Sequence, residues 1–282
     1  MMALGKKRLG LVQKIKEIMS QIGIKMTVRQ IYYQLVSKHL IENNKNSYKS
    51  FDNTLTLARE ENLINPFDII DTSKPIIKAA SWSNLSEFLT TVKDAYRKRV
   101  WDNQETYVEV WLEKDALRGI FEPITNQYDV YLVIGKGYQS YTNLIRTTKR
   151  LPEGKEIHIL YFGDFDPTGL DIPRNIKERL ESFGIIFEFH KIALTPGQIK
   201  KYDLPPNLTK KTDSRAKGFV AIYGDNTVEL DALDPKVLRD LIENSILNYI
   251  DIDKYDEAVE QEKSDLSKIQ EIIGNIDVGG DE

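Results

Sequence analysis

The stretch EIHILYFGDFDPTGLDI, residues 156–172, decides the fold expected for this chain. Its first half is an apolar run of the kind that forms a buried strand, and Asp164 and Asp166 follow at the C-terminal end of that strand. Pro167 and Gly169 then turn the chain into a helix. Open α/β sheets bind ligands beyond the carboxyl ends of their strands, and two close carboxylates repel each other unless a cation or a proton lies between them. The stretch therefore predicts a strand, a rigid corner and a site for a divalent metal.

Strands and helices alternate on both sides of this stretch, from Thr106 onward. The apolar runs predict strands at 106–112, 129–135, 156–163 and 185–194. The three- and four-residue spacings predict helices at 114–126, 138–151, 171–183, 198–202, 234–250 and 254–273, with a polar loop at 204–219. Such alternation favours an α/β fold with a mainly parallel sheet covered by helices.

The first part of the chain has a different pattern. Its apolar spacing predicts helices at 6–22, 27–40 and 48–61, followed by a short hairpin or wing at 63–70. Thr27 and Gln30 have the spacing of a capping box, which would begin the second helix. Three short helices and a wing are typical of a winged-helix DNA-binding domain, and a generic helical domain is the alternative. We therefore expect a winged-helix domain at 1–74, a helical connector at 75–105 interrupted by Pro75, and an α/β domain at 106–282.

Composition excludes several classes of protein. With 282 residues, 41% of them hydrophobic and 29% charged, the chain has the composition of a globular protein, not a disordered one. No apolar run approaches the ~18 residues of a membrane span, and the first residues lack the apolar core of a signal peptide, so we expect a cytoplasmic protein without a membrane partner. The absence of cysteine excludes disulfides, thiolate zinc sites and cysteine nucleophiles. The three histidines, His39, His158 and His190, show no metal-ligand spacing and are expected to be structural.

The net charge of −4 conceals an asymmetry between the two parts of the chain. Residues 1–100 contain 17 Lys+Arg and 9 Asp+Glu, a balance of +8, and the remaining residues carry −12. A basic segment suits a polyanion such as nucleic acid, and an acidic one suits cations. The alternative is an unevenly charged, solvated surface.

Other candidate site residues lie at the predicted strand ends. Glu113 follows the strand 106–112 just as Asp164 and Asp166 follow theirs, so parallel strands would bring three carboxylates to one edge of the sheet. Oxygen ligands of this kind suit Mg²⁺. Lys114 is a candidate phosphate contact, or else only solvates the sheet edge.

The segment GKGY is a weaker candidate. Lys136 and Gly137 follow another predicted strand, and the glycines would allow a phosphate or a partner strand to approach the backbone closely. No segment has the GxxxxGK[ST] spacing of an ATP-binding phosphate loop.

The motif RQIYY, residues 29–33, provides a candidate nucleophile. On a helix Tyr32 would face inward, whereas Arg29 and Tyr33 would share the outer face one turn apart. A guanidinium near a phenol can stabilise the phenolate or hold a scissile phosphate. The alternative is an exposed Tyr–Arg pair without chemistry.

In this order, RQIYY, WLEKDAL, GKGY and GDFDPTG resemble a known family over roughly residues 27–183. The three later motifs are similar to the toprim domain, a Rossmann-like Mg²⁺-binding module of topoisomerases, primases and some nucleases. The whole order resembles the A subunit of topoisomerase VI and the related meiotic double-strand-break proteins, most of all the short stand-alone forms of mobile genetic elements called Topo mini-A. Position 30 is Gln where the family usually has an acid.

This resemblance implies a division of roles among the candidate residues. Tyr33 would be the nucleophile and Arg29 its assistant, while Glu113, Asp164 and Asp166 would hold Mg²⁺. In the family the tyrosine of one subunit works with the toprim site of its partner, so the resemblance implies a homodimer acting on double-stranded DNA. A separate ATPase B subunit is a further possible partner.

Three functional hypotheses follow. The first is a type IIB topoisomerase-like transesterase that cleaves DNA and forms a 5′-phosphotyrosyl link. The second is a toprim nuclease that hydrolyses DNA with activated water and needs the carboxylates but not Tyr33. The third is a DNA-binding or regulatory module whose toprim domain is vestigial.

Overall fold

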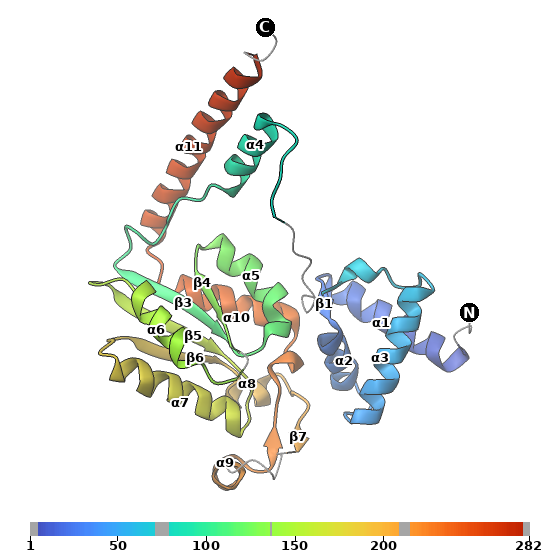
Figure 1. Cartoon of the computed structure of the whole chain (residues 1–282). Helices are drawn as coiled ribbons and strands as arrows, with labels where there is room; N and C mark the ends of the chain where they lie inside the picture. The colour runs from blue at the N-terminus through green and yellow to red at the C-terminus, as the bar shows by residue number, and fades with distance from the viewer. Residues whose placement is uncertain (1–4, 71–78, 136, 209–214, 279–282) are drawn as a thin grey trace.

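A computed structural model describes residues 5–70, 79–135, 137–208 and 215–278. Figure 1 shows a small helical part at the N-terminus, a larger α/β part built around one sheet, and an arm of two helices that projects from the α/β part. The mixed α/β class predicted from the sequence is confirmed.

The central sheet has four strands, all parallel, in the order β4-β3-β5-β6. They are β3 (Thr106–Leu112), β4 (Tyr131–Ile134), β5 (Glu156–Phe162) and β6 (Glu188–Ala193). The four predicted strands are therefore confirmed, although β4 and β6 are shorter than expected. In β3 and β5 the last residues, Leu112 and Phe162, are paired in register, so the two strands end side by side. The loops that follow β3 and β5 therefore begin at the same edge of the sheet.

Helices cover both faces of the sheet (Figure 1). Side chains of a strand point alternately to opposite faces. Accordingly, Leu160 belongs to the core shared with α5 (Arg118–Gln127) and α10 (Pro235–Leu247), whereas Ile159 packs with residues of α6 (Tyr141–Arg150) and α7 (Pro167–Ser182). The sheet is thus a buried middle layer, as its nearly continuous apolar runs predict.

The N-terminal part contains the helices α1 (Lys6–Ile22), α2 (Val28–Ser37) and α3 (Lys45–Glu60). Gly23, with φ of 70°, ends α1 in the left-handed conformation. The predicted capping box is confirmed, because the side chains of Thr27 and Gln30 each accept the other's backbone N–H. The three helices pack around a shared apolar core of Ile15, Ile18, Ile31, Leu35, Phe51 and Leu55.

The region predicted to form a hairpin or wing is built differently. A single turn, η1 (Pro66–Asp68), leads into β2 (Ile69–Ile70), which pairs in parallel with β1 (Met26–Thr27). The described part of 63–70 is therefore not an antiparallel hairpin, because the apolar pair Ile69–Ile70 binds the segment before α2. Residues 71–74, and Pro75 of the expected connector, lie outside the described residues.

The region predicted to be a polar loop, 204–219, is partly regular. Between α8 (Pro196–Lys201) and α10 the chain forms β7 (Asn207–Leu208), α9 (Ala216–Tyr223), β8 (Asn226–Thr227) and the turn η3 (Leu230–Ala232). Strands β7 and β8 pair antiparallel. The missed strand is only two residues long, and its partner lies almost twenty residues away, so local periodicity does not reveal it.

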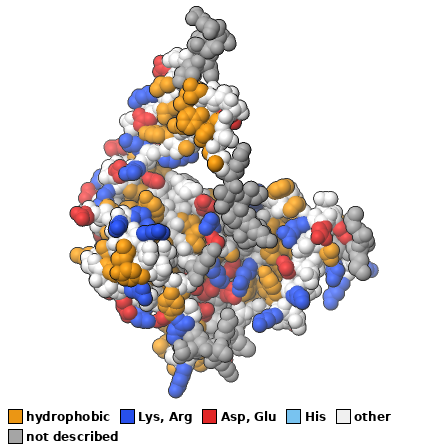
Figure 2. Space-filling model, viewed as in Figure 1, with side chains coloured by type: hydrophobic (Ala, Val, Ile, Leu, Met, Phe, Trp, Pro, Cys, Tyr) orange, Lys and Arg blue, Asp and Glu red, His pale blue; other side chains and the backbone are white. Residues whose placement is uncertain are grey.

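The arm consists of α4 (Leu85–Ala95) and α11 (Ile252–Val278), which lie side by side away from the sheet (Figure 1). The hydroxyl of Tyr96 donates to Asp265 at 2.9 Å and joins the two segments. Figure 2 shows hydrophobic side chains gathered on the arm. The exposed large apolar residues of this region include Trp82, Leu85, Phe88, Val92 and Ile272. In the part of the chain that is described, no helix combines the length and the apolar character needed to cross a membrane.

Candidate functional site

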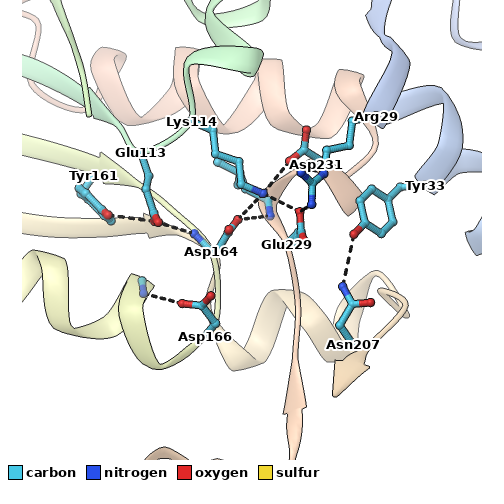
Figure 3. A network of polar contacts seen from close by, with 12 residues as sticks. Arg29, Tyr33, Glu113, Lys114, Tyr161, Asp164, Asp166, Asn207, Glu229 and Asp231 are labelled. Carbon is cyan, nitrogen blue, oxygen red and sulfur yellow. Dashed lines mark hydrogen bonds and ion pairs between the residues drawn. The ribbon is translucent and has the colours of Figure 1, made fainter. Parts of the chain in front are cut away.

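Carboxylates gather where β3 and β5 end. Glu113 follows β3 directly, and Asp164 and Asp166 follow β5 after Gly163. The Glu113 Oε2 atom accepts the backbone N–H of Asp164 at 3.1 Å and the hydroxyl of Tyr161 at 3.1 Å (Figure 3). The structure thus brings Glu113 to the loop that carries both aspartates, although about fifty residues separate them in the chain.

The surroundings of Glu113 disfavour the ionised form of its carboxyl group. Burial raises its pKa to about 7, and the charges of Asp164 and Asp166 act in the same direction, while the hydrogen bonds from Asp164 and Tyr161 oppose the shift. A buried carboxylate beside other carboxylates is stable only with a proton or a cation nearby. Burial and the two neighbouring aspartates thus both disfavour the ionised form of Glu113.

Asp164 is buried, with 8% of its surface exposed. Its Oδ1 accepts the backbone N–H of Leu230 at 2.7 Å and lies 3.0 Å from Lys114 Nζ. Burial raises its pKa, although the Lys114 ammonium and the Leu230 N–H oppose the shift. The side chain is held by contacts from two other segments of the chain.

Asp166 is the N-cap of α7, where its Oδ1 accepts the backbone N–H of Gly169 at 2.6 Å. Gly169 packs against the backbone of Asp164 so closely that an added Cβ would overlap the carbonyl of that residue. The glycine is thus required for the tight corner that sets the two aspartates next to each other.

Lys191 supports the same corner from β6 and was not predicted from the sequence. Its Nζ donates to the backbone carbonyls of Asp164 and Gly169, both at 2.9 Å. Burial lowers its pKa to about 8, although the nearby carboxylates oppose the shift. A single lysine in a strand gives no local signal, because only the register of β5 and β6 places it behind the loop.

Lys114 lies among carboxylates. Its Nζ is 3.0 Å from Asp164 Oδ1, 2.8 Å from Glu229 Oε2 and 2.7 Å from Asp231 Oδ2 (Figure 3). Burial by itself would lower the pKa of this ammonium, but the three carboxylates outweigh it and raise the pKa. A contact between Lys114 and a phosphate stays a prediction.

Glu229 and Asp231 are site residues that the sequence reasoning missed. They come from the segment VELDAL, which has the same acid-x-acid spacing as GDFDP within an apolar context, and that signal could have identified them. Asp231 is completely buried, and its Oδ1 has no hydrogen-bond partner among the described residues. Burial would raise the pKa of Glu229, but Lys114 and Arg29 outweigh it and lower the pKa.

Arg29 extends this network into the N-terminal part. Helix α2 packs against η3, and the Arg29 guanidinium forms an ion pair with Glu229 and lies 3.9 Å from Asp231. Burial alone would lower the pKa of Arg29, but the two carboxylates raise it. The guanidinium therefore remains charged at the junction of the two parts of the chain.

The prediction that Tyr33 faces outward is wrong. Only 4% of its surface is exposed, and its hydroxyl accepts the Asn207 side-chain N–H at 3.3 Å (Figure 3). The spacing within α2 alone predicts that this face of the helix is exposed. In the folded chain the C-terminal part covers it. Burial raises the pKa of Tyr33, and Glu229 adds to the shift, while Asn207 and Arg29 oppose it. Tyr32 is buried, as predicted.

The GKGY segment lies at the same edge of the sheet as the carboxylates. The Gly135 N–H donates to the carbonyl of Leu112, the last residue of β3, at 2.7 Å. Gly137 is half-buried and has φ of 97°, a conformation that favours glycine. Lys136 lies outside the described residues.

The predicted Mg²⁺ ligands are neighbours but do not form a closed cage. Among the described residues, the trio of His, Cys, Asp or Glu side chains whose ligand atoms all lie within 4.8 Å of one another is His158, Glu188 and His190, at another place in the fold. Mg²⁺ usually takes only one or two protein carboxylates and completes its shell with water and phosphate oxygens. The oxygen-only set of Glu113, Asp164 and Asp166, with the raised pKa of Glu113, fits such an ion.

No protein-family model matches this chain, and no curated protein sequence matches it at a significant level. The resemblance to the topoisomerase VI A family consequently rests on the ordered sequence motifs alone.

Proposed function

We propose that the chain is a Mg²⁺-dependent DNA-cleaving transesterase of the type IIB topoisomerase A-subunit type, with a winged-helix domain at 1–74 and a toprim domain within 106–282. One observation carries the proposal. A network of ion pairs links Arg29 through Glu229 and Lys114 to Asp164 (Figure 3), and the Arg29 guanidinium lies 6.0 Å from the centre of the Tyr33 ring. The two halves of the proposed chemistry, a phenol beside a guanidinium and a cluster of carboxylates, therefore belong to one site.

The residues of this site would divide the reaction as follows. The Tyr33 oxygen attacks the phosphorus, the bond from phosphorus to the 3′ oxygen breaks, and the 5′ phosphate becomes linked to the tyrosine. The phenolic proton would pass to a carboxylate of the site that faces the released tyrosine, and the departing 3′ oxygen would take up a proton from water. Arg29 would then stabilise the phosphoryl oxygens once DNA replaces its carboxylate partners.

The metal would be held by Asp164, Asp166 and Glu113. When bound, Mg²⁺ supplies positive charge to the transferring phosphoryl group and the leaving oxygen. Asp164 is kept in place by the Leu230 N–H, and its loop is supported by Lys191.

Access of DNA to Tyr33 requires the contact between α2 and η3 to open, because the ring is almost fully buried. A homodimer, as implied by the family resemblance, would let the released tyrosine work with the carboxylates of the partner subunit. Double-stranded DNA, a second copy and an ATPase B subunit are therefore the partners we propose. The positive balance of residues 1–100 supports a salt-sensitive grip on the duplex phosphates.

A second candidate, a toprim nuclease that hydrolyses DNA without a protein link, is favoured by one observation. Tyr33 is buried, and its raised pKa keeps the phenol protonated, whereas the carboxylates lie at the end of the sheet. A hydrolytic enzyme would need Glu113, Asp164 and Asp166 but would use Tyr33 only for packing.

Incubation of supercoiled plasmid with the protein and Mg²⁺, analysed on gels with and without protease treatment, tests both functions. Transesterification predicts linear DNA that carries protein until protease is added, and Tyr33→Phe should abolish these adducts while DNA binding persists. Tyr141→Phe, at an exposed position in α6, is the matched control and should cleave like the wild type. Protein-free ends that persist in the Tyr33→Phe variant support hydrolysis instead, and an absence of Mg²⁺-dependent cleavage contradicts both.

A further inference from the structure

A second cluster of metal-binding side chains lies at the opposite end of the sheet. The sequence contains EIH at 156–158 and EFH at 188–190, and these segments open the neighbouring parallel strands β5 and β6. His158 is paired in register with Glu188. Because residues two apart on a strand share a face, both acid-x-His pairs point to the α10 side of the sheet. Two histidines that are 32 residues apart in the chain therefore meet.

Three atoms of this cluster form a nearly equilateral triangle. His158 Nδ1 lies 3.3 Å from His190 Nε2 and 3.5 Å from Glu188 Oε2, and His190 Nε2 lies 3.3 Å from Glu188 Oε2. A tetrahedral ion with ligand bonds of about 2.0–2.1 Å holds its ligands about 3.3 Å apart. The three atoms thus have the spacing of one face of a tetrahedral coordination shell.

We propose that His158, Glu188 and His190 bind a Zn²⁺ ion. Two imidazoles and one carboxylate are a ligand set that zinc prefers, whereas Mg²⁺ prefers oxygen alone. The site is separate from the carboxylates at the other end of β5, because Asp164 lies six positions after His158 along the chain, which corresponds to about 20 Å in extended conformation. The sequence shows no metal-ligand spacing for these histidines, because only the pairing of β5 with β6 brings them together.

Glu156 completes the arrangement. The Nε2 atom of His158 is buried, has no hydrogen-bond partner in the described part of the chain, and faces Glu156 Oε1 at 3.5 Å. A histidine that binds zinc usually donates its other ring N–H to a carboxylate, which fixes the tautomer and the ring orientation. Zinc bound to Nδ1 would place the His158 proton on Nε2. This N–H could then donate a hydrogen bond to the Glu156 carboxylate.

The residues around the cluster leave it accessible to an ion from solvent. They also show which elements a bound ion would stabilise. The Glu188 side chain is 59% exposed, so the fourth coordination position can be reached by water. Tyr249, which follows α10, stacks on His158 with ring centroids 3.9 Å apart, and its hydroxyl lies 3.2 Å from His190 Nε2. A bound ion would therefore brace the starts of β5 and β6 beneath the end of α10, which predicts an effect on stability.

The test uses the full chain without a polyhistidine tag, stripped of metal with a chelator and titrated with Zn²⁺ by calorimetry. We expect one Zn²⁺ per chain, a rise in Tm with zinc, and visible absorption bands of tetrahedral cobalt when Co²⁺ replaces zinc. His190→Gln and Glu188→Gln alter partly exposed side chains that can be changed without emptying the core, and each should weaken zinc binding at least tenfold and remove the Tm rise.

His39→Gln is the matched control, because His39 lies in the N-terminal part, far from the cluster, and should leave zinc binding unchanged. The proposal is overturned if the wild type binds no zinc. It is also overturned if His190→Gln and Glu188→Gln bind zinc as tightly as the wild type, or if His39→Gln lowers the affinity as much as they do.

Discussion

Arg29 and Glu229 form an ion pair that ties helix α2 to the segment before η3, one helical turn from the candidate nucleophile. The pair holds the N-terminal helices against the α/β part and covers Tyr33 at the same time. In the proposed reaction the contact must open, so its strength sets how readily the tyrosine becomes accessible.

Glu229→Gln should loosen this contact. We expect a loss of about 1 kcal/mol in the free energy of unfolding, a modest value because the Arg29 side chain is 44% exposed and water screens the pair. The pKa of Tyr33 should fall, since a negative charge that raises it is removed. Urea denaturation measures the first effect, and the ultraviolet absorbance of phenolate in difference spectra against Tyr33→Phe measures the second. Glu178→Gln, which removes an exposed pair with Arg174 in α7, should change neither quantity.

Gly169→Ala should distort the aspartate corner. An added Cβ would meet the carbonyl carbon of Asp164 at 3.0 Å and overlap its oxygen, so the loop must shift. Overpacking of this kind typically costs about 1–3 kcal/mol. We expect that decrease in urea denaturation, together with weaker Mg²⁺ binding in calorimetry. Gly197→Ala, in the first turn of α8 with open space around the new methyl group, serves as the control, and an equal decrease there would contradict the explanation.

Mg²⁺ affinity should rise with pH through about 7, where Glu113 loses its proton. A protonated carboxyl cannot bind the ion, so a calorimetric titration at about pH 6 should give weaker binding than one at about pH 8, with proton release on binding. Glu113→Gln should weaken binding and remove this pH dependence. If the Mg²⁺ affinity of that variant depends on pH as in the wild type, the proton released on binding comes from another group.

The metal-free protein should respond to pH in the opposite direction. The folded pKa of Glu113 lies above its ordinary value of 4.5, so its protonation stabilises the fold fully below pH 4.5, and this contribution is lost as pH rises through about 7. The Glu113→Gln variant should show a smaller decrease in unfolding free energy than the wild type between about pH 5 and pH 8. A chelator must be present in both measurements.

DNA binding should depend on salt and on the basic surface of α1. Lys14→Glu combined with Lys16→Glu, both at exposed positions, should weaken binding to every duplex sequence and reduce the slope of log affinity against log salt by about 1 for each phosphate that is no longer neutralised. Fluorescence anisotropy with two unrelated duplexes measures both quantities. Lys263→Glu on the distant arm should leave the slope unchanged, and a slope that is equally reduced there would place the DNA elsewhere.

Local sequence patterns were sufficient for much of the fold. The apolar runs identified all four strands of the central sheet, and their alternation with helices implied that the strands are parallel. The capping box of Thr27 and Gln30 and the left-handed Gly23 gave the start of α2 and the end of α1. The position of Asp164 and Asp166 directly after a strand placed them at the edge where Glu113 also lies. Each of these features depends on residues only a few positions apart, or on the rule that parallel strands end on one side.

Tertiary structure alone decided which side chains meet across the chain. The periodicity of α2 could not show that Tyr33 is buried, because the residues next to it, Asn207 and Glu229, come at least 174 positions later in the chain. The contact between His158 and His190 likewise depends on long-range packing, because the register of β5 and β6 sets it. The sequence by itself determined the elements and the carboxylates at the strand ends, since short-range sterics and hydrophobic spacing specify them. Packing between distant segments determined that Arg29 and Lys114 pair with the acidic residues of VELDAL. The burial and the charge neutralisation in this network exist only once the chain has folded.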